Sequence, residues 1–386
     1  MIRSTLQRFC AGLRLRTVFF AAALLPTAFV CAEPIVIGQV APLTGVLAST
    51  GKDMVLGAKI YFDSVNAQGG INGVKIKHVV RDDAYTVAQT VLQTTEMLQQ
   101  DRPIALIGFA GTGNVGELLK QKILEKADIA MVGPYTGSPR LRGPDNLNIF
   151  HIRASYWDET ETIADQLVTL KMTRIGVMYQ NDAFGESGRD GVIASLKKHN
   201  LEPVVLATYE KNTADTSAAA KKIGAANPQA VIMISVNKPT ASFSKAVREI
   251  ANIAQLFNIS VVNSKEIVKL IGPEYARGIG IAQVMPNPNS IAVPVVKEYQ
   301  AAIKRFAPAG TEYSYTSLEE FIAAKVLVEA IRRSGGAPTS HKVLLALAGM
   351  TSYDSGGLPL HFSDTNRIGS KFVELTIINR YGQLMH

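Results

Sequence analysis

The sequence has little of what covalent chemistry, metal binding or membrane insertion requires. It contains two cysteines and one tryptophan, and charged residues make up 19% of its 386 residues. Its six histidines are scattered without the spacing of metal ligands, and no G-x-S-x-G, H-E-x-x-H or P-loop motif is present. Beyond residue 32, no apolar run reaches the ~20 residues of a membrane-spanning helix. We therefore expect a protein without catalytic residues, metal or cofactor.

The first 32 residues have the three parts of a secretory signal peptide. Four arginines and no acidic residue precede an apolar stretch at residues 18–30. Small residues then form a cleavage site before Glu33. A retained membrane anchor is one alternative, but the stretch is short for a span. A lipoprotein modified at Cys31 is another, disfavoured by the bulky Phe29 and Val30 before it. Both cysteines lie in this segment, so we expect an exported, cysteine-free mature chain in an oxidising compartment.

The net charge argues against a nucleic-acid partner. The formal charge is +8, and the four arginines of the signal segment supply half of it. The remaining charge is mild and dispersed, whereas nucleic-acid binders concentrate basic residues on one face.

With 47% apolar residues the chain can bury a large core, and its length predicts two or three domains.

Short β-branched runs alternate with helical patterns in two series. We expect strands of the first series at residues 35–40, 74–80, 104–108 and 129–132. We expect strands of the second series at residues 175–179, 204–208, 231–235 and 259–263. Such alternation indicates two doubly wound α/β lobes with parallel sheets. Further helices and a last strand at residues 372–378 follow, so we expect the chain to cross between the lobes several times.

Residues 111–116 match G-x-G-x-x-G, the fingerprint of dinucleotide-binding turns. The motif follows the third expected strand and not the first, and no acid after the next strand is placed to bind a ribose hydroxyl. A glycine-rich turn that opens a helix also suits any anion held by helix N-terminal amides. A nucleotide-dependent enzyme remains an alternative to a binding protein.

Turns rich in hydroxyl groups and glycine recur at the ends of the first-series strands. They lie at residues 42–45, 111–113 and 134–139. Ligands of open parallel sheets bind at the carboxyl ends of the strands, where free amides and hydroxyls suit a small carboxylate. Ordinary turns are the alternative explanation for each of the three.

Several motifs together resemble a known family. They include residues 37–45, the Asn-x-x-Gly-Gly-Ile-x-Gly pattern at residues 66–73, Asp82-Asp83, Val132-Gly133-Pro134 and Phe184-Gly185. Over residues 34–386 the sequence resembles the type I periplasmic solute-binding proteins of branched-chain amino-acid (leucine/isoleucine/valine) ABC transporters.

The resemblance implies the type I periplasmic binding protein fold, with two lobes joined by a three-strand hinge that closes on a ligand. We expect an N-terminal lobe of residues 33–152 plus 286–357. We expect a C-terminal lobe of residues 153–285 plus 358–386.

The resemblance also implies a set of ligand contacts. Thr112 matches a serine that binds the ligand carboxylate, and Tyr135 and Gly137 match positions that bind the carboxylate and the ammonium group. Gly137 lacks the hydroxyl found in the family, which Thr136 or Ser138 can replace.

Four further positions belong to the expected ligand-binding set. Thr50, Phe184 and Asn237 match aromatic positions of the family. Trp157, with Tyr156 beside it, follows the first expected crossover and would border the cleft, with packing at a helix start as the alternative.

Asn263 falls where the amino-acid binders have a glutamate that pairs with the ligand's ammonium group. Burying an ammonium without an anionic partner costs several kcal/mol. The residue chemistry therefore favours an aromatic or aliphatic acid, or an amide, whereas the resemblance favours a branched-chain amino acid.

We expect a monomeric periplasmic solute receptor that delivers a small carboxylate-bearing solute to an inner-membrane ABC permease. The alternative within the same fold is a ligand sensor that contacts a signalling receptor in place of a permease.

Overall fold

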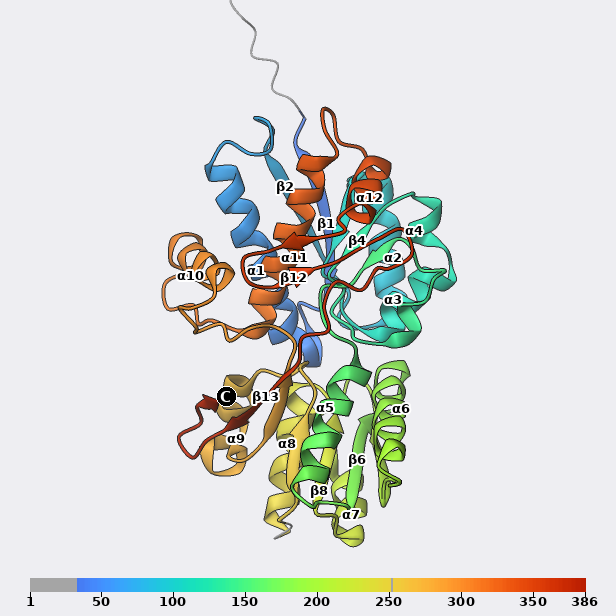
Figure 1. Ribbon diagram of the computed structural model, residues 1–386, viewed down its shortest axis with the longest axis vertical. Helices are drawn as coiled ribbons and strands as arrows, with labels where there is room; N and C mark the ends of the chain where they lie inside the picture. Colours follow the sequence, from blue (N-terminus) through green and yellow to red (C-terminus); the bar gives the residue numbers. More distant parts are fainter. Residues whose placement is uncertain (1–32, 251–252) are drawn as a thin grey trace, which may run out of the picture. The chain divides into compact units, whose positions relative to one another are not determined.

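The computed structural model of the protein describes residues 33–250 and 253–386 (Figure 1). The signal peptide expected at residues 1–32 lies outside this part of the chain. Within the described ranges, no helix combines the length and apolar character needed to cross a membrane.

The first sheet has five parallel strands in the order β2-β1-β3-β4-β5. Its strands are β1 (Ile35–Ala41), β2 (Ile76–Asp82), β3 (Ala105–Ile107), β4 (Met131–Val132) and β5 (Ile149–Phe150). The helices between these strands are η1 (Gly45–Leu47), α1 (Ala48–Ala67), α2 (Val87–Gln100), α3 (Thr112–Lys120), α4 (Ile123–Lys126) and η2 (Pro139–Leu141). Three later helices and a short hairpin join them: α10 (Pro294–Phe306), α11 (Tyr315–Arg333), α12 (Ser340–Ala348), β11 (Tyr353–Asp354) and β12 (Pro359–Leu360). We call these elements the N-terminal lobe.

The second sheet has seven strands in the order β14-β13-β10-β9-β8-β6-β7, with β13 and β14 antiparallel to their neighbours. Its strands are β6 (Ile175–Gln180), β7 (Val205–Tyr209), β8 (Ala230–Ile234), β9 (Gln255–Asn258), β10 (Gly280–Gln283), β13 (Glu374–Ile378) and β14 (Leu384–Met385). The accompanying helices are α5 (Tyr156–Thr169), α6 (Ala183–Lys198), α7 (Ser217–Ala226), α8 (Asn237–Glu249) and α9 (Ser264–Ala276). We call these elements the C-terminal lobe.

Three connections join the lobes, after β5, after β10 and between β12 and β13 (Figure 1). The predicted α/β fold with two mostly parallel sheets is confirmed, while the expected lobe boundaries stay a prediction. The strand expected at residues 259–263 differs, because β9 ends at Asn258. Asn263 instead caps α9, since its side-chain oxygen accepts hydrogen bonds from the amides of Lys265 and Glu266 at 3.0 and 3.4 Å.

The glycine-rich pattern at residues 66–73 has a structural role. Gly70 has a left-handed φ of 84°, and a Cβ there would lie 2.1 Å from the carbonyl oxygen of Val74. Asn66 at the end of α1 exchanges two hydrogen bonds with the backbone of Ile76, at 2.8 and 2.9 Å. These contacts set where β2 begins and so place its carboxyl end beside β1.

Candidate functional site

The carboxyl ends of the first-series strands lead into a small cavity between the lobes. The cavity has a volume of about 10 Å³, which is room for about one water molecule. It is lined from both lobes by Leu47, Tyr85, Gly111, Tyr135, Tyr156, Phe184, Val236 and Val261. We call it the central cavity. Its size means that a solute can enter only when the lobes separate.

Two threonine hydroxyls meet beside the central cavity. The hydroxyls of Thr112 and Thr136 lie 2.8 Å apart, and both residues are buried. Thr112 is the first residue of α3, and Gly111 before it has a left-handed φ of 97°. The N-terminal amides of α3 carry partial positive charge, so the two hydroxyls and these amides suit an anion. The G-x-G-x-x-G motif therefore forms a turn at the mouth of the cleft.

Tyr135 and Gly137 lie on the loop that follows β4. The Tyr135 hydroxyl is 3.1 Å from the Thr316 hydroxyl, and its ring centroid is 4.7 Å from the guanidinium carbon of Arg153. The carbonyl of Gly137 accepts a hydrogen bond from the amide of Tyr156 at 2.8 Å. A Cβ on Gly137 would lie 2.6 Å from the Tyr156 ring, so a side chain does not fit there.

Aromatic side chains of the C-terminal lobe cover this loop. The rings of Tyr156 and Phe184 pack edge to face, with centroids 5.4 Å apart. Phe184 is placed by Asp182, whose carboxylate accepts hydrogen bonds from the amides of Phe184 and Gly185 and so caps α6. The structure thus brings Phe184 to the cavity with Tyr135.

Trp157 does not line the central cavity. Its side chain is 44% exposed, and its indole N–H donates to the carbonyl of Ser187 at 3.2 Å. Trp157 and Tyr156 are adjacent on α5 and therefore point in different directions, and Tyr156 is the one that faces the cleft. The sequence placed both aromatics near the cleft but could not orient the helix.

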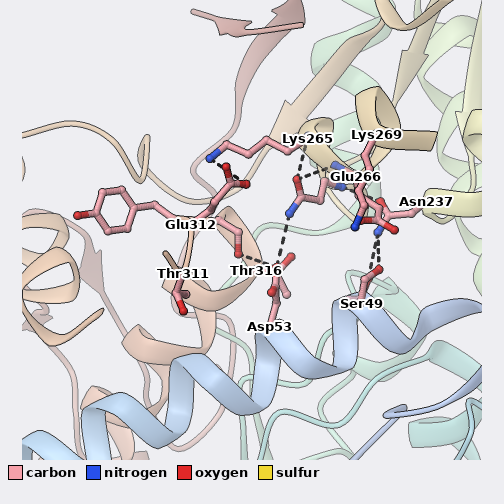
Figure 2. Close-up of a pocket in the computed structure, with 13 residues that line it drawn as sticks. Ser49, Asp53, Asn237, Lys265, Glu266, Lys269, Thr311, Glu312 and Thr316 are labelled. Atoms are coloured by element: carbon pink, nitrogen blue, oxygen red, sulfur yellow. Dashed lines mark hydrogen bonds and ion pairs between the residues drawn. The ribbon is translucent and has the colours of Figure 1, made fainter. Parts of the chain in front are cut away.

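Thr50, Asn237 and Asn263 form a second group, beside a separate pocket of about 290 Å³ (Figure 2). The side-chain amide of Asn237 donates to the hydroxyls of Ser49 and Thr50 at 3.3 and 3.5 Å. Its carbonyl oxygen accepts from the amide of Asn263 at 2.7 Å. The bonds to Ser49 and Thr50 connect the two lobes, whereas the bond to Asn263 lies within the C-terminal lobe. We call this space the rim pocket.

Tyr85 is a cavity residue that the sequence reasoning missed. Its φ is 60°, and its amide donates to the Asp83 carboxylate at 2.9 Å, while the amide of Ala84 donates to Asp82 at 2.9 Å. The Asp82-Asp83 pair therefore shapes a turn that holds Tyr85 in the cleft. This acid pair after a strand was the signal that could have located it.

Lys211 extends from the C-terminal lobe to the N-terminal lobe next to Tyr85. Its ammonium nitrogen lies 4.0 Å from the Tyr85 ring centroid and 2.9 Å from the side-chain oxygen of Asn114. Within its own lobe it lies 3.7 Å from Asp182. Burial lowers the pKa of Lys211, and the nearby carboxylates of Asp182 and Asp83 oppose that shift.

A buried charge cluster lies under the first interlobe connection. Arg153 is fully buried, with its Nε 3.5 Å from Glu319 of α11 and its guanidinium bonded to the hydroxyl of Ser260. Glu159 accepts a hydrogen bond from the amide of Ser260 at 2.6 Å. Burial raises the pKa of Glu159 to about 7, although Arg153 opposes that shift. These groups tie the connection to both lobes.

The chain is similar to known periplasmic receptors over most of its length. Residues 34–376 match the family described as periplasmic binding protein. An "Amino acid binding protein" of Pseudomonas aeruginosa is 27% identical over 75% of this chain and 78% of its own. The "Leu/Ile/Val-binding protein homolog 3" of Brucella melitensis is 24% identical over 92% of this chain and 94% of its own.

A solved structure shows the same arrangement. The crystal structure of a substrate-binding periplasmic protein from Ralstonia solanacearum is 38% identical, has a TM-score of 0.87 and covers 91% of this chain and 99% of that chain. The family binds solutes without catalysis, so the prediction of a binding protein over a nucleotide-dependent enzyme is confirmed. The chain belongs to the periplasmic binding protein family, in the branch related to Leu/Ile/Val-binding proteins.

Proposed function

We propose that this protein captures a small carboxylic acid solute in the periplasm and delivers it to an ABC permease. The observation that carries the proposal is the pair of buried hydroxyls, Thr112 and Thr136, at the N-terminus of α3. The names of the relatives, which are amino-acid and Leu/Ile/Val binders, support a solute of this size and class.

The walls of the central cavity favour a solute with an apolar or aromatic body. Four of its eight lining residues are aromatic, and none carries a carboxylate. Tyr85 and Tyr135 come from the N-terminal lobe, and Tyr156 and Phe184 from the C-terminal lobe. A solute carboxylate at the α3 turn would therefore have its body enclosed between rings of both lobes.

Closure follows from the same geometry. The carboxylate partners belong to the N-terminal lobe, so we expect capture there before the C-terminal lobe closes over the solute. Closure then adds Phe184 and the bonds made by Lys211 and Asn237 across the cleft. Water is excluded, which strengthens the hydrogen bonds to the carboxylate.

The test is a ligand screen on the mature chain, residues 33–386, refolded from denaturant to remove carried solute. Thermal shift and calorimetry would compare leucine, 4-methyl-2-oxopentanoate, benzoate and NAD. We expect at least one of the three carboxylates to raise the midpoint by several degrees, since a ligand at 100 times its Kd stabilises by about 2.7 kcal/mol. Stabilisation by NAD alone, or by none of the four, would contradict the proposal.

A further inference from the structure

The rim pocket adjoins the central cavity along three segments of the chain. Leu47, Val236 and Val261 line the central cavity, and residues one to three positions further along each segment line the rim pocket. Figure 2 shows Ser49 and Asp53 on α1 facing Asn237, Lys265 and Lys269 of the other lobe. The rim pocket is thus lined by both lobes and widens when they separate.

The side-chain partners of Asp53 in this pocket are neutral. Its carboxylate accepts hydrogen bonds from the Ser314 hydroxyl at 2.8 Å and from the Asn263 side-chain amide at 3.5 Å. Among the described residues it makes no ion pair within 4.0 Å. Burial raises the pKa of Asp53, and the charges of Glu266 and Glu312 raise it further. A cation beside Asp53 would offset these costs.

The charges that line the pocket do not cancel. Lys265 pairs with Glu312 at 3.4 Å. The three acids, Asp53, Glu266 and Glu312, outnumber the two lysines, Lys265 and Lys269. The pocket as a whole therefore carries an excess of one negative charge.

The cation that suits this pocket is organic. In the part of the chain that the structure describes, no group of three or more His, Cys, Asp or Glu side chains could hold a metal ion. Hydroxyls also line the pocket, and the one that contacts Asp53 is that of Ser314; the others belong to Ser49, Thr50 and Thr316. A primary ammonium donates three hydrogen bonds, which one carboxylate and neighbouring hydroxyls can accept.

We propose that the rim pocket is a subsite for a primary ammonium group of the solute, with Asp53 as its anionic partner. This proposal rests on the proposed function, because the carboxylate of the same solute binds at Thr112 and Thr136. It also revises what Asn263 means for the ligand. Asn263 itself carries no charge, but it lies against a carboxylate that α1 brings from the opposite lobe.

The test compares acids that differ only in the ammonium group, in two pairs: leucine with 4-methylpentanoate, and 6-aminohexanoate with hexanoate. Calorimetry on the refolded mature chain gives the Kd of each. We expect the ammonium-bearing member of at least one pair to bind at least tenfold more tightly. Asp53→Asn, which keeps the shape of the side chain, should reduce this preference at least tenfold and change the Kd of the plain acid by less than threefold.

The matched control is Asp63→Asn, on the same helix, where the carboxylate pairs with Lys59 at the surface. This variant should keep the preference of the unaltered protein. Equal binding of both members of each pair by the unaltered protein would overturn the proposal and leave the proposed function intact. An equal loss for both members in Asp53→Asn would also overturn it. No binding of any acid would refute the proposed function, and this proposal with it.

Discussion

Lys211→Met should shift the protein from the closed toward the open arrangement of its lobes. Only two of the contacts of Lys211 depend on closure, the hydrogen bond to Asn114 at 2.9 Å and the cation–π contact with Tyr85 at 4.0 Å. The contact with Asp182 lies within one lobe and is the same in both states. A hydrogen bond to a charged group contributes about 1.5 kcal/mol or more, and a partly buried cation–π contact about 1 kcal/mol.

Together these contacts favour closure by about 2.5 kcal/mol before solvent screening and roughly 2 kcal/mol after it, which corresponds to about a 30-fold change in the closed-to-open ratio. The side chain of Lys211 is 19% exposed, so solvent screens these contacts only in part. We therefore expect the closed-to-open ratio to fall by about 30-fold in Lys211→Met. Solute binding should weaken by the same factor if the solute binds the closed state.

The assay needs two labels, and both cysteines of the sequence lie within residues 1–32. Lys126→Cys on α4 and Lys221→Cys on α7 place one exposed label on each lobe of the mature chain. Double electron–electron resonance then gives the two distance populations, with and without solute. Lys198→Met is the matched control, because its ion pair with Glu161 stays within the C-terminal lobe. A closed-to-open ratio that changes less than twofold in Lys211→Met would show that Lys211 does not stabilise the closed state.

Two further changes have defined outcomes. Thr112→Ala should weaken binding of the carboxylate by about 1–2 kcal/mol, measured by calorimetry. Thr112→Ser keeps the hydroxyl and should bind as the unaltered protein does. Unchanged affinity in Thr112→Ala would show that this hydroxyl does not contact the solute. Burial lowers the pKa of His78 to about 4, below its usual 6.5, so the unfolded chain takes up a proton first as the pH falls. This linkage should lower the free energy of unfolding by about 2 kcal/mol between pH 7 and pH 5, measured by urea unfolding. His78→Gln should remove that loss. An equal loss in the variant would show that His78 is not its source.

Local patterns in the sequence were enough to predict most of the fold. Alternating β-branched runs and helical patterns predicted both sheets, because each strand and helix depends chiefly on its own apolar periodicity. The strand β13 was expected, but its antiparallel direction was not, and neither was the end of β9 at Asn258. Strand direction and strand ends depend on neighbours far along the chain, such as the pairing of β13 with β10.

The candidate site divides in the same way. Thr112 and Tyr135 lie in glycine-rich turns at strand ends, which leave a local signal, whereas Phe184 was expected from the family resemblance. The structure brings Tyr135 and Phe184 to one cavity and Thr112 beside it. Trp157 and Tyr156 could not be told apart, since only the packing of α5 decides which faces the cleft. Ligand binding by Thr112, Tyr135 and Phe184 stays a prediction.

Local stretches of sequence account for the strand and helix order, the glycine turns and the position of the Thr112 hydroxyl at the α3 N-terminus. These features depend on residues within a few positions of one another. The contact of Asp53 with Asn263 and that of Lys211 with Asn114 arise from the folding of the whole chain, because each pair joins segments that are distant in the chain and lie in different lobes. The charge available to a solute is therefore a property of the folded lobes, since electrostatic partners are chosen by distance in space and not by position in the sequence.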